Sequence, residues 1–193
     1  MGMNYRVQIQ LRFFLSTPFF LSVVIKFYFG HQLGVDLQAK AVSHLEEVSD
    51  EGISALASSA QSGSPTVAVL LPTTAYTLRL KSPPARKMID AGSCVSLGSD
   101  FNPNAYCYNM ATVMNLACVI MRMTPNEALV AATLNSAQAL GVSGQRGAIG
   151  IGRMADLVIL DTPKWENLIY QLGCSHELVK YVVKEGKVVY SKN

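Results

Sequence analysis

Short apolar runs, each bounded by turn-forming residues, alternate with helical patterns through the middle of the chain. Three runs have the length and flanking residues of buried strands, at 41–44, 67–71 and 93–97. Helical patterns separate and follow them, at 49–59, 84–90, 112–123 and 124–140. This alternation is typical of parallel β/α units, so we expect an α/β fold. The segment 112–123 is apolar nearly all round, which predicts a buried helix.

Two of these helices carry recognisable start signals. Either Ser49 or Asp50 can cap the helix at 49–59. Thr124 and Glu127 have the spacing of a capping box, and the helix that they open is predicted to continue to Leu140. These local signals predict where the two helices begin.

Beyond Gly150 the pattern changes to strands without long helices between them. Apolar runs at 155–160 and 178–183 precede a third run at 187–190. The last two are joined by the two-residue turn Glu185–Gly186, which predicts a β-hairpin.

The beginning of the chain contains an apolar run that lacks the pattern of the later strands and helices. The run 13–25 is uncharged and rich in Phe, and it follows Arg6 and Arg12. It is shorter than the about 20 residues that a bilayer span needs. Three interpretations stay open: a secretory signal, a barrel strand with its flank, or a non-native start.

Composition narrows the class of protein. The chain has 193 residues, of which 50% are hydrophobic and 15% charged, enough for one domain with a real core. The net charge of +3 comes from scattered basic residues, so nucleic-acid binding has no support. None of the four cysteines has C-x-x-C spacing, and Cys94 and Cys118 lie in apolar runs, which is typical of small buried residues in a reducing compartment. Three histidines limit any metal site built by this chain alone.

Polar residues lie at the end of each of the three strands predicted at 41–44, 67–71 and 93–97. His44 ends one run, Thr73 and Thr74 follow the next, and Asp100 follows the third. The carboxyl ends of barrel strands converge on one mouth, where such enzymes place their chemistry. A buried carboxylate is costly unless it holds a metal, a cation or a proton. The alternatives are that Asp100 caps a turn and that His44 is a structural histidine at a strand end.

Two further cations follow the second strand. Arg79 and Lys81 either meet an anionic substrate or are solvated surface residues. His176 lies in a turn of the C-terminal region, where we expect it to be structural or exposed.

Three motifs give a specific resemblance. They are Ser43-His44-Leu45-Glu46, Leu70-Leu71-Pro72-Thr73-Thr74-Ala75-Tyr76 and Leu97-Gly98-Ser99-Asp100-Phe101-Asn102-Pro103-Asn104. Together they resemble the imidazolonepropionase family of the amidohydrolase superfamily. The segments 133–141 and 147–161 are similar to a helix and a returning strand common to that superfamily, and the resemblance covers roughly residues 32–193.

The resemblance implies a fold in two parts. Residues 32–146 would form part of an amidohydrolase (β/α)8 TIM-type barrel, namely strands six to eight. Residues 147–193 would supply the C-terminal strands of a small β-sandwich domain, and residues 1–31 stay unmatched.

The resemblance also implies an activity. The family uses a metal to hydrolyse the ring C–N amide bond of 4-imidazolone-5-propanoate, giving N-formimidoyl-L-glutamate in cytoplasmic histidine catabolism. Asp100 matches a metal ligand that also accepts a proton from water, and His44 matches a residue that polarises the carbonyl or relays a proton. Asn102, Asn104 and Ala105 match the substrate-binding loop. A homodimer is possible, and neither nucleic acid nor a membrane is expected as a partner.

The sequence departs from the family at the metal site. The family holds one zinc or iron per subunit with a His-x-His pair, a third His and Asp100's counterpart, and it has a catalytic Glu near the third His. This chain contains no His-x-His, and residues 13–29 contain no His, Asp or Glu. We therefore expect the chain alone to be incomplete and inactive, because zinc takes three or four protein ligands.

Three alternatives remain beside the enzyme. The chain could be a non-catalytic half-barrel that associates with a partner chain through open strand edges. It could be a membrane-associated or secreted product directed by 13–29. It could also be another amidohydrolase, such as a different cyclic amidase or a deaminase, although the motifs at 73–76 and 102–104 argue against this.

Overall fold

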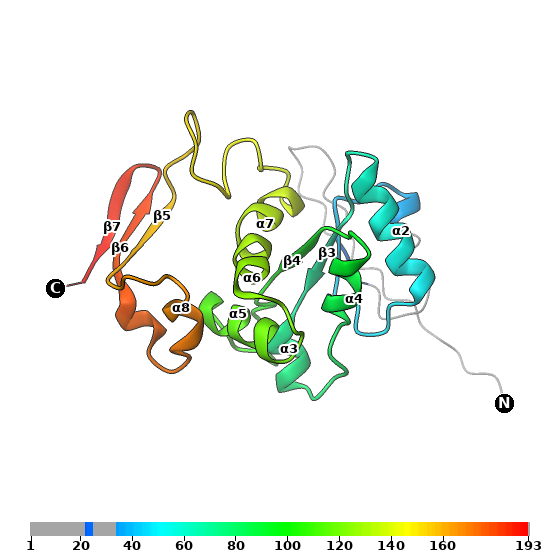
Figure 1. Ribbon diagram of the computed structural model, residues 1–193, viewed down its shortest axis with the longest axis horizontal. Coiled ribbons are helices and arrows are strands. Elements are labelled where there is room, and N and C mark those ends of the chain that lie inside the picture. Colours follow the sequence, from blue (N-terminus) through cyan, green and yellow to red (C-terminus); the bar gives the residue numbers. More distant parts are fainter. Residues whose placement is uncertain (1–21, 25–33, 193) are drawn as a thin grey trace.

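A parallel sheet of four strands forms the centre of the computed structural model, which describes residues 22–24 and 34–192. The strands lie in chain order: β1 (Ser22–Val24), β2 (Ala41–Ser43), β3 (Val67–Leu70) and β4 (Val95–Leu97) (Figure 1). Ser43 lies opposite Val69, and Leu70 opposite Leu97. The carboxyl ends of the strands therefore share one edge of the sheet.

Helices follow the strands of this sheet, as the alternating pattern predicts. They are α2 (Asp50–Gln61), α3 (Pro72–Thr77), α4 (Ala85–Asp90), α5 (Met110–Val119), α6 (Pro125–Ala132) and α7 (Leu134–Ala139). The cap of α2 is Ser49, whose hydroxyl accepts from the Gly52 amide at 3.2 Å, while Asp50 lies in the first turn near the positive end of the helix dipole.

The core lies between the sheet and these helices. Leu56 of α2, Leu70 of β3, Met88 of α4 and Val113 of α5 are all fully buried. They belong to one apolar cluster, so a single core joins the sheet to its helices.

The predicted helix 124–140 is wrong in its middle, where the chain breaks at Thr133 into α6 and α7. The hydroxyl of Thr133 donates to the Leu129 carbonyl at 2.7 Å, and that of Ser136 donates to Ala131 at 2.8 Å. Hydroxyls that take carbonyls of the preceding turn compete with the helical backbone bonds. The break directs Asn135 and Ser136 onto β4, where they donate to the carbonyls of Val95 and Leu97.

Helix α5 also differs from its predicted span. It begins earlier because Asn109 accepts hydrogen bonds from the amides of Ala111 and Thr112. It ends at Val119, which is 70% exposed, so the expectation of a helix buried all round is wrong at this end.

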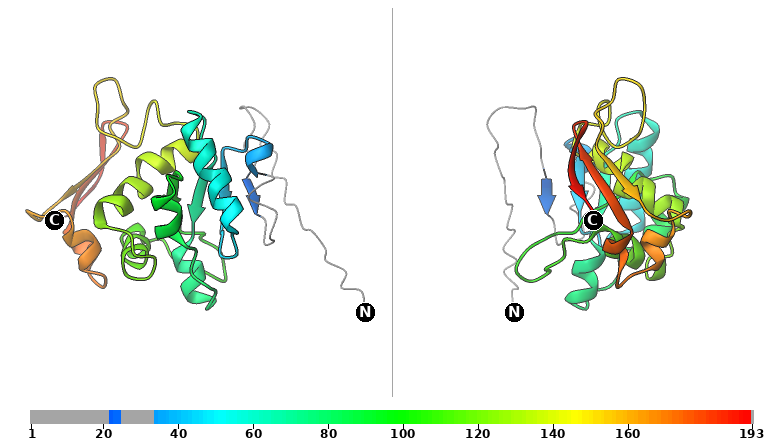
Figure 2. Two further views of the ribbon diagram at one scale, coloured as in Figure 1. Left: turned by 45° about the vertical axis from the view of Figure 1, so that its right-hand side comes forward. Right: turned by 90° about the vertical axis from the view of Figure 1, so that its left-hand side faces the viewer.

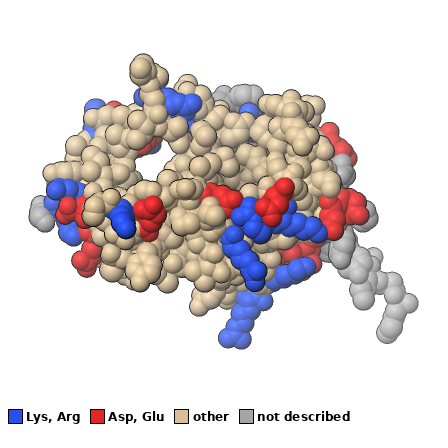
Figure 3. Space-filling model, viewed as in Figure 1, with Lys and Arg blue, Asp and Glu red and all other residues tan. Residues whose placement is uncertain are grey.

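The C-terminal part is a separate antiparallel sheet (Figure 2). Its strands are β5 (Leu157–Leu160), β6 (Val179–Lys184) and β7 (Lys187–Ser191). The predicted hairpin is confirmed: Glu185 and Gly186 turn with φ of 52° and 79° between β6 and β7. Figure 3 shows an opening between this sheet and the helices, so the sheet is not packed along its whole length.

Short helices join the two parts. Helix α8 (Asn167–Tyr170) packs against α5, and the Asn115 side chain donates to the Ile169 carbonyl at 3.0 Å. The 3-10 helix η1 (Ser175–Leu178) follows, and it carries His176 exposed, as expected.

Most of the apolar N-terminal run lies outside the described residues. Its end at 22–24 forms β1, which pairs in parallel with β2. Residues 22–24 are therefore a strand, and the interpretation of the rest of the run lies outside the described residues. Within 22–24 and 34–192, no helix has both the length and the apolar character needed to cross a membrane.

Candidate active site at the carboxyl edge of the parallel sheet

The three polar positions that follow the strands all lie at the carboxyl edge of the sheet. His44 comes directly after β2, and Asp100 follows β4. Thr73 and Thr74 do not extend β3. They form the first turn of α3, because Pro72 is suited to the first helical position.

The two threonines bind the loop that carries Asp100. Thr74 Oγ1 donates to Asp100 Oδ2 at 2.8 Å, and Thr73 Oγ1 donates to the Ser99 carbonyl at 3.0 Å. Both threonines are buried. The first turn of α3 therefore fixes the backbone before Asp100 and one oxygen of its carboxylate.

The loop after Asp100 holds its own shape. Asp100 has a φ of 49°, in the left-handed region that a non-glycine residue adopts at a cost. Asn102 Nδ2 donates to the Asp100 carbonyl at 2.5 Å, and Asn102 Oδ1 accepts from the Asn104 amide at 2.8 Å. The Asn102 side chain thus organises the turn.

The other two residues expected to bind substrate differ in exposure. Asn104 is exposed, whereas Ala105 is almost fully buried and its backbone pairs with Asn102. Of the three predicted substrate-binding residues, Asn104 therefore presents the most accessible amide group.

Three aromatic side chains on this loop were missed from the sequence. The rings of Phe101 and Tyr108 are stacked with centroids 4.0 Å apart, and Tyr106 meets Phe101 edge-on at 4.7 Å. Tyr106 and Tyr108 are 74% and 75% exposed. Their close spacing after Asp100 in a Pro- and Asn-containing loop was the signal that could have revealed an aromatic rim.

His44 has an unusual backbone and a nearby carboxylate. Its φ is 76°, its amide donates to the Val69 carbonyl at 3.1 Å, and Nδ1 lies 3.3 Å from Glu46 Oε1. The half-buried ring can therefore hold or pass a proton beside a carboxylate.

The described residues do not provide enough ligands for a complete metal site. Within 22–24 and 34–192, no three His, Cys, Asp or Glu side chains are grouped closely enough to hold an ion. Asp100 is one carboxylate with one oxygen already bound by Thr74. Zinc sites in proteins use three or four ligands, so this donor set is insufficient.

Known proteins resemble this chain over most of its length. A protein of Bos taurus described as "Probable imidazolonepropionase" is 61% identical over 161 residues, which are 83% of this chain and 37% of that protein. Its counterpart in Homo sapiens is 58% identical over 82% of this chain and 36% of that protein. The "Imidazolonepropionase" of Rubrobacter xylanophilus is 44% identical over 80% and 36%. The chain thus spans little more than a third of these curated relatives.

Solved structures share the fold. Guanine deaminase of E. coli superposes with a TM-score of 0.63 at 20% identity, covering 79% of this chain and 39% of that one. Ochratoxinase of A. niger gives 0.65 at 21% identity, covering 85% and 40%. These likenesses show an α/β fold of the kind found in TIM-barrel amidohydrolases, over part of their chains.

The model of the amidohydrolase family matches residues 35–190. This range includes β2, β3 and β4, the residues at their carboxyl ends and the C-terminal antiparallel sheet. Members of the family are typically metal-dependent hydrolases. Because the match covers most of the sequence, the chain belongs to the amidohydrolase family.

Proposed function

We propose that this chain supplies the C-terminal part of an imidazolonepropionase. The enzyme would hydrolyse the ring C–N amide bond of 4-imidazolone-5-propanoate to N-formimidoyl-L-glutamate. The observation that carries this proposal is the 44% to 61% identity to imidazolonepropionases over at least 80% of the chain. The proposed setting is the cytoplasm, with a homodimer as a possible assembly and with no nucleic-acid or membrane partner.

The proposed architecture follows the order of the elements. Strands β2, β3 and β4 correspond to barrel strands six to eight within residues 32–146. Residues 147–193 correspond to the C-terminal strands of the β-sandwich domain, and residues 1–31 are an N-terminal segment unmatched by the family, of which 22–24 pair with β2.

Each residue at the carboxyl edge has a proposed role that its surroundings support. Asp100 accepts a proton from the attacking water, because Thr74 engages its Oδ2 while no hydrogen bond from the described residues reaches its Oδ1. The half-buried ring of His44 relays a proton or polarises the carbonyl. Asn104 donates its amide to the propanoate group of the substrate, and the turn made by Asn102 and Ala105 sets its position.

The metal assignment needs residues beyond those described. Asp100 is proposed as one ligand of a single zinc or iron ion, and the described residues form no group of three ligand side chains around it. The remaining ligands must therefore come from outside residues 22–24 and 34–192. Because softer and harder ligands select different metals, those residues would decide between zinc and iron.

A complementation experiment tests the proposal. The 193-residue chain is co-expressed with the part of the Bos taurus relative that it does not cover, and turnover of 4-imidazolone-5-propanoate is measured on the purified complex. We expect turnover that Asp100→Asn abolishes and that Asp161→Asn, an exposed carboxylate after β5, leaves intact. A stable complex without turnover, or one unaffected by Asp100→Asn, would contradict the proposal.

A second candidate function is non-catalytic association with a partner chain. The observation that favours it is the exposure of apolar side chains on the C-terminal sheet, including Val158, Val188 and Val189. In the same co-expression experiment, this function predicts a stable complex that forms equally well with Asp100→Asn and has no activity.

A further inference from the structure

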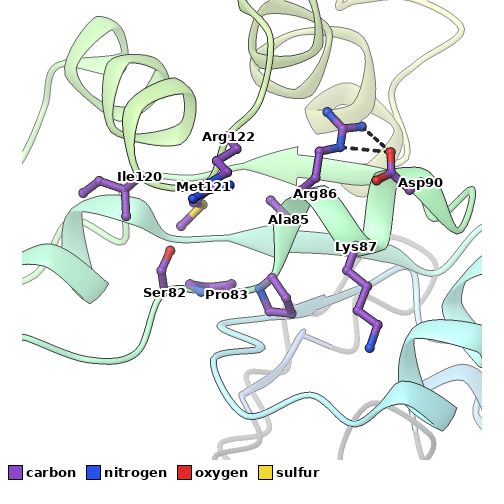
Figure 4. Close-up of a pocket in the computed structure, with 10 residues that line it drawn as sticks. Ser82, Pro83, Ala85, Arg86, Lys87, Asp90, Ile120, Met121 and Arg122 are labelled. Carbon is purple, nitrogen blue, oxygen red and sulfur yellow. Dashed lines mark hydrogen bonds and ion pairs between the residues drawn. The ribbon is translucent and has the colours of Figure 1, made fainter.

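A groove lies between two loops on the side of the molecule shown in Figure 4. One wall is residues 79–84, which connect α3 to α4, and the other is the turn 120–122 after α5. Two adjoining cavities of about 510 Å³ and 310 Å³ form the groove. They are continuous because both are lined by Ser82, Ile120 and Met121.

The groove is distinct from the site at the carboxyl edge. No residue of the Asp100 site lines it. Helix α3 separates the two places: Thr74 binds Asp100, whereas Ala75 and Tyr76 line the groove. A ligand in the groove would therefore leave the proposed active-site residues uncovered.

Positive side chains gather around α3 and α4 (Figure 3), and three of them are already paired. The paired cations are Lys81 with Glu47 at 3.5 Å, Lys87 with Asp50 at 2.5 Å, and Arg86 with Asp90 and Glu127 at 2.9 Å. Figure 4 shows the guanidinium of Arg86 turned to Asp90 and the Lys87 side chain extending away from Met121, although Arg86, Asp90 and Lys87 all line the larger cavity. These three cations are therefore engaged by the protein.

Two other arginines of the groove, Arg79 and Arg122, differ from these cations because they have no ion pair with the described residues and have positive φ angles. Arg79 lines one cavity and Arg122 lines the other, and both are exposed. Neither forms an ion pair with any carboxylate in the part of the chain that the structure describes. Their φ angles are 53° and 58°, in the left-handed region where a side chain is strained.

A buried hydroxyl belongs to Ser82, which lines both cavities. The Ser82 Oγ atom is buried, and it has no hydrogen-bond partner among the described residues. Figure 4 shows it directed toward Ile120 and Met121, across the groove. A buried polar atom without a partner is unusual in a folded protein and indicates a position that another molecule can satisfy.

We propose that this groove binds a small organic anion. The guanidiniums of Arg79 and Arg122 would contact its phosphate or carboxylate oxygens, since the planar Arg fork matches both groups. The apolar body of the ligand would lie over Ile120 and Met121. The Ser82 hydroxyl, which is closed off from solvent in this conformation, would rotate toward the groove to donate to the ligand. This proposal does not depend on the imidazolonepropionase assignment.

Calorimetric titration of the 193-residue chain tests the proposal. Phenyl phosphate and benzoate serve as probes and separate phosphate from carboxylate recognition, while phenol is the neutral control. We expect saturable binding of at least one anion and none of phenol. Arg122→Gly and Arg79→Gly should each weaken binding about tenfold, the loss expected for one charge-assisted contact.

The glycine variants keep the test free of misfolding. Glycine adopts positive φ without strain, and this relief offsets the entropy that glycine adds to the unfolded chain, so both variants should keep the melting temperature while losing affinity. Lys180→Ala is the matched control, because it removes a cation of β6 that pairs with Asp161 and lines neither cavity, and it should leave binding unchanged. Equal binding by all variants, equal binding of phenol, or the absence of saturable binding by either anion would overturn the proposal.

Discussion

The parallel sheet and the C-terminal sheet use similar apolar residues but bury them very differently. In the first region Leu56, Leu70 and Met88 are fully buried. In the second, Val188 and Val189 are each 62% exposed. An apolar strand is therefore evidence of burial only when the chain also provides something to cover it.

The two sheets differ in burial because only the parallel sheet has helices from its own β/α units packed against it. Each β/α unit places a helix beside its own strand, so α2, α4 and α6 come from the same stretch of chain as the sheet. The C-terminal sheet follows no such unit, and beside the junction through α8 it is connected by polar contacts. Arg146 pairs with Asp156 and Glu185, and Lys184 also reaches Asp156. These side chains stay partly open to solvent, and solvent screening limits what such ion pairs contribute to stability.

The largest expected effect separates the two regions directly. Leu70→Ala leaves a cavity in the core of the parallel sheet and should lower the free energy of unfolding by about 2–5 kcal/mol. Val158→Ala on the 57% exposed face of β5 is the matched control and should change it by less than about 0.5 kcal/mol. Urea denaturation followed by circular dichroism measures both, and equal losses would refute the contrast.

The junction between the regions should show the next largest effect. A Cβ at Gly147 would lie 2.6 Å from Ala137 Cβ and 2.9 Å from the Thr133 carbonyl oxygen. Gly147→Ala should therefore destabilise by about 1–3 kcal/mol through overpacking at the α6–α7 break.

Gly152→Ala is its control, because Gly152 has a similar φ of 80° but no atom near its Cβ position. Any loss from positive φ alone appears in both variants. If the two melting temperatures fall equally in a thermal melt, the close contact at Gly147 is not what holds the break.

The smallest effect concerns the ion pair that joins α4 to α6. The side-chain hydrogen bonds from Arg86 lower the pKa of Glu127 to about 2 from 4.5. Because the folded pKa lies below the unfolded one, the stabilisation is present above about pH 4.5 and is lost as the pH falls toward 2. Solvent screening limits it to about 1 kcal/mol.

Glu127→Gln tests this by removing the charge while keeping an oxygen for the capping box with Thr124. Unfolding free energies measured from pH 2 to pH 7 should converge for the two proteins at the acid end and differ above pH 4.5. Asp161→Asn is a control with a longer ion pair of 3.8 Å. A constant difference at every pH would contradict the linkage.

Local signals account for the parts of the fold that could be predicted. The hairpin at Glu185–Gly186 and the capping box at Thr124 depend on neighbouring residues, and both are confirmed. The break at Thr133 could not be predicted in this way, because it involves Gly147, which comes from a later segment, and contacts to β4.

Some features of the candidate site could also be predicted from the sequence, and others could not. The meeting of Thr74 and Asp100 follows from parallel strands that end at one edge, which the β/α pattern predicts. The internal use of the Asn102 side chain and the stacking of Phe101 on Tyr108 depend on the detailed path of the loop. The roles assigned to His44, Asp100, Asn104 and their neighbours stay predictions until activity is measured.

The most direct test of the central claim is metal content. Zinc and iron per chain are measured by mass spectrometry after purification of the 193-residue chain, alone and in complex with the complementary part of the Bos taurus relative. The account predicts no stoichiometric metal on the chain alone and one ion per complex, lost with Asp100→Asn. One tightly bound ion per isolated chain would contradict the claim that Asp100 needs ligands from elsewhere.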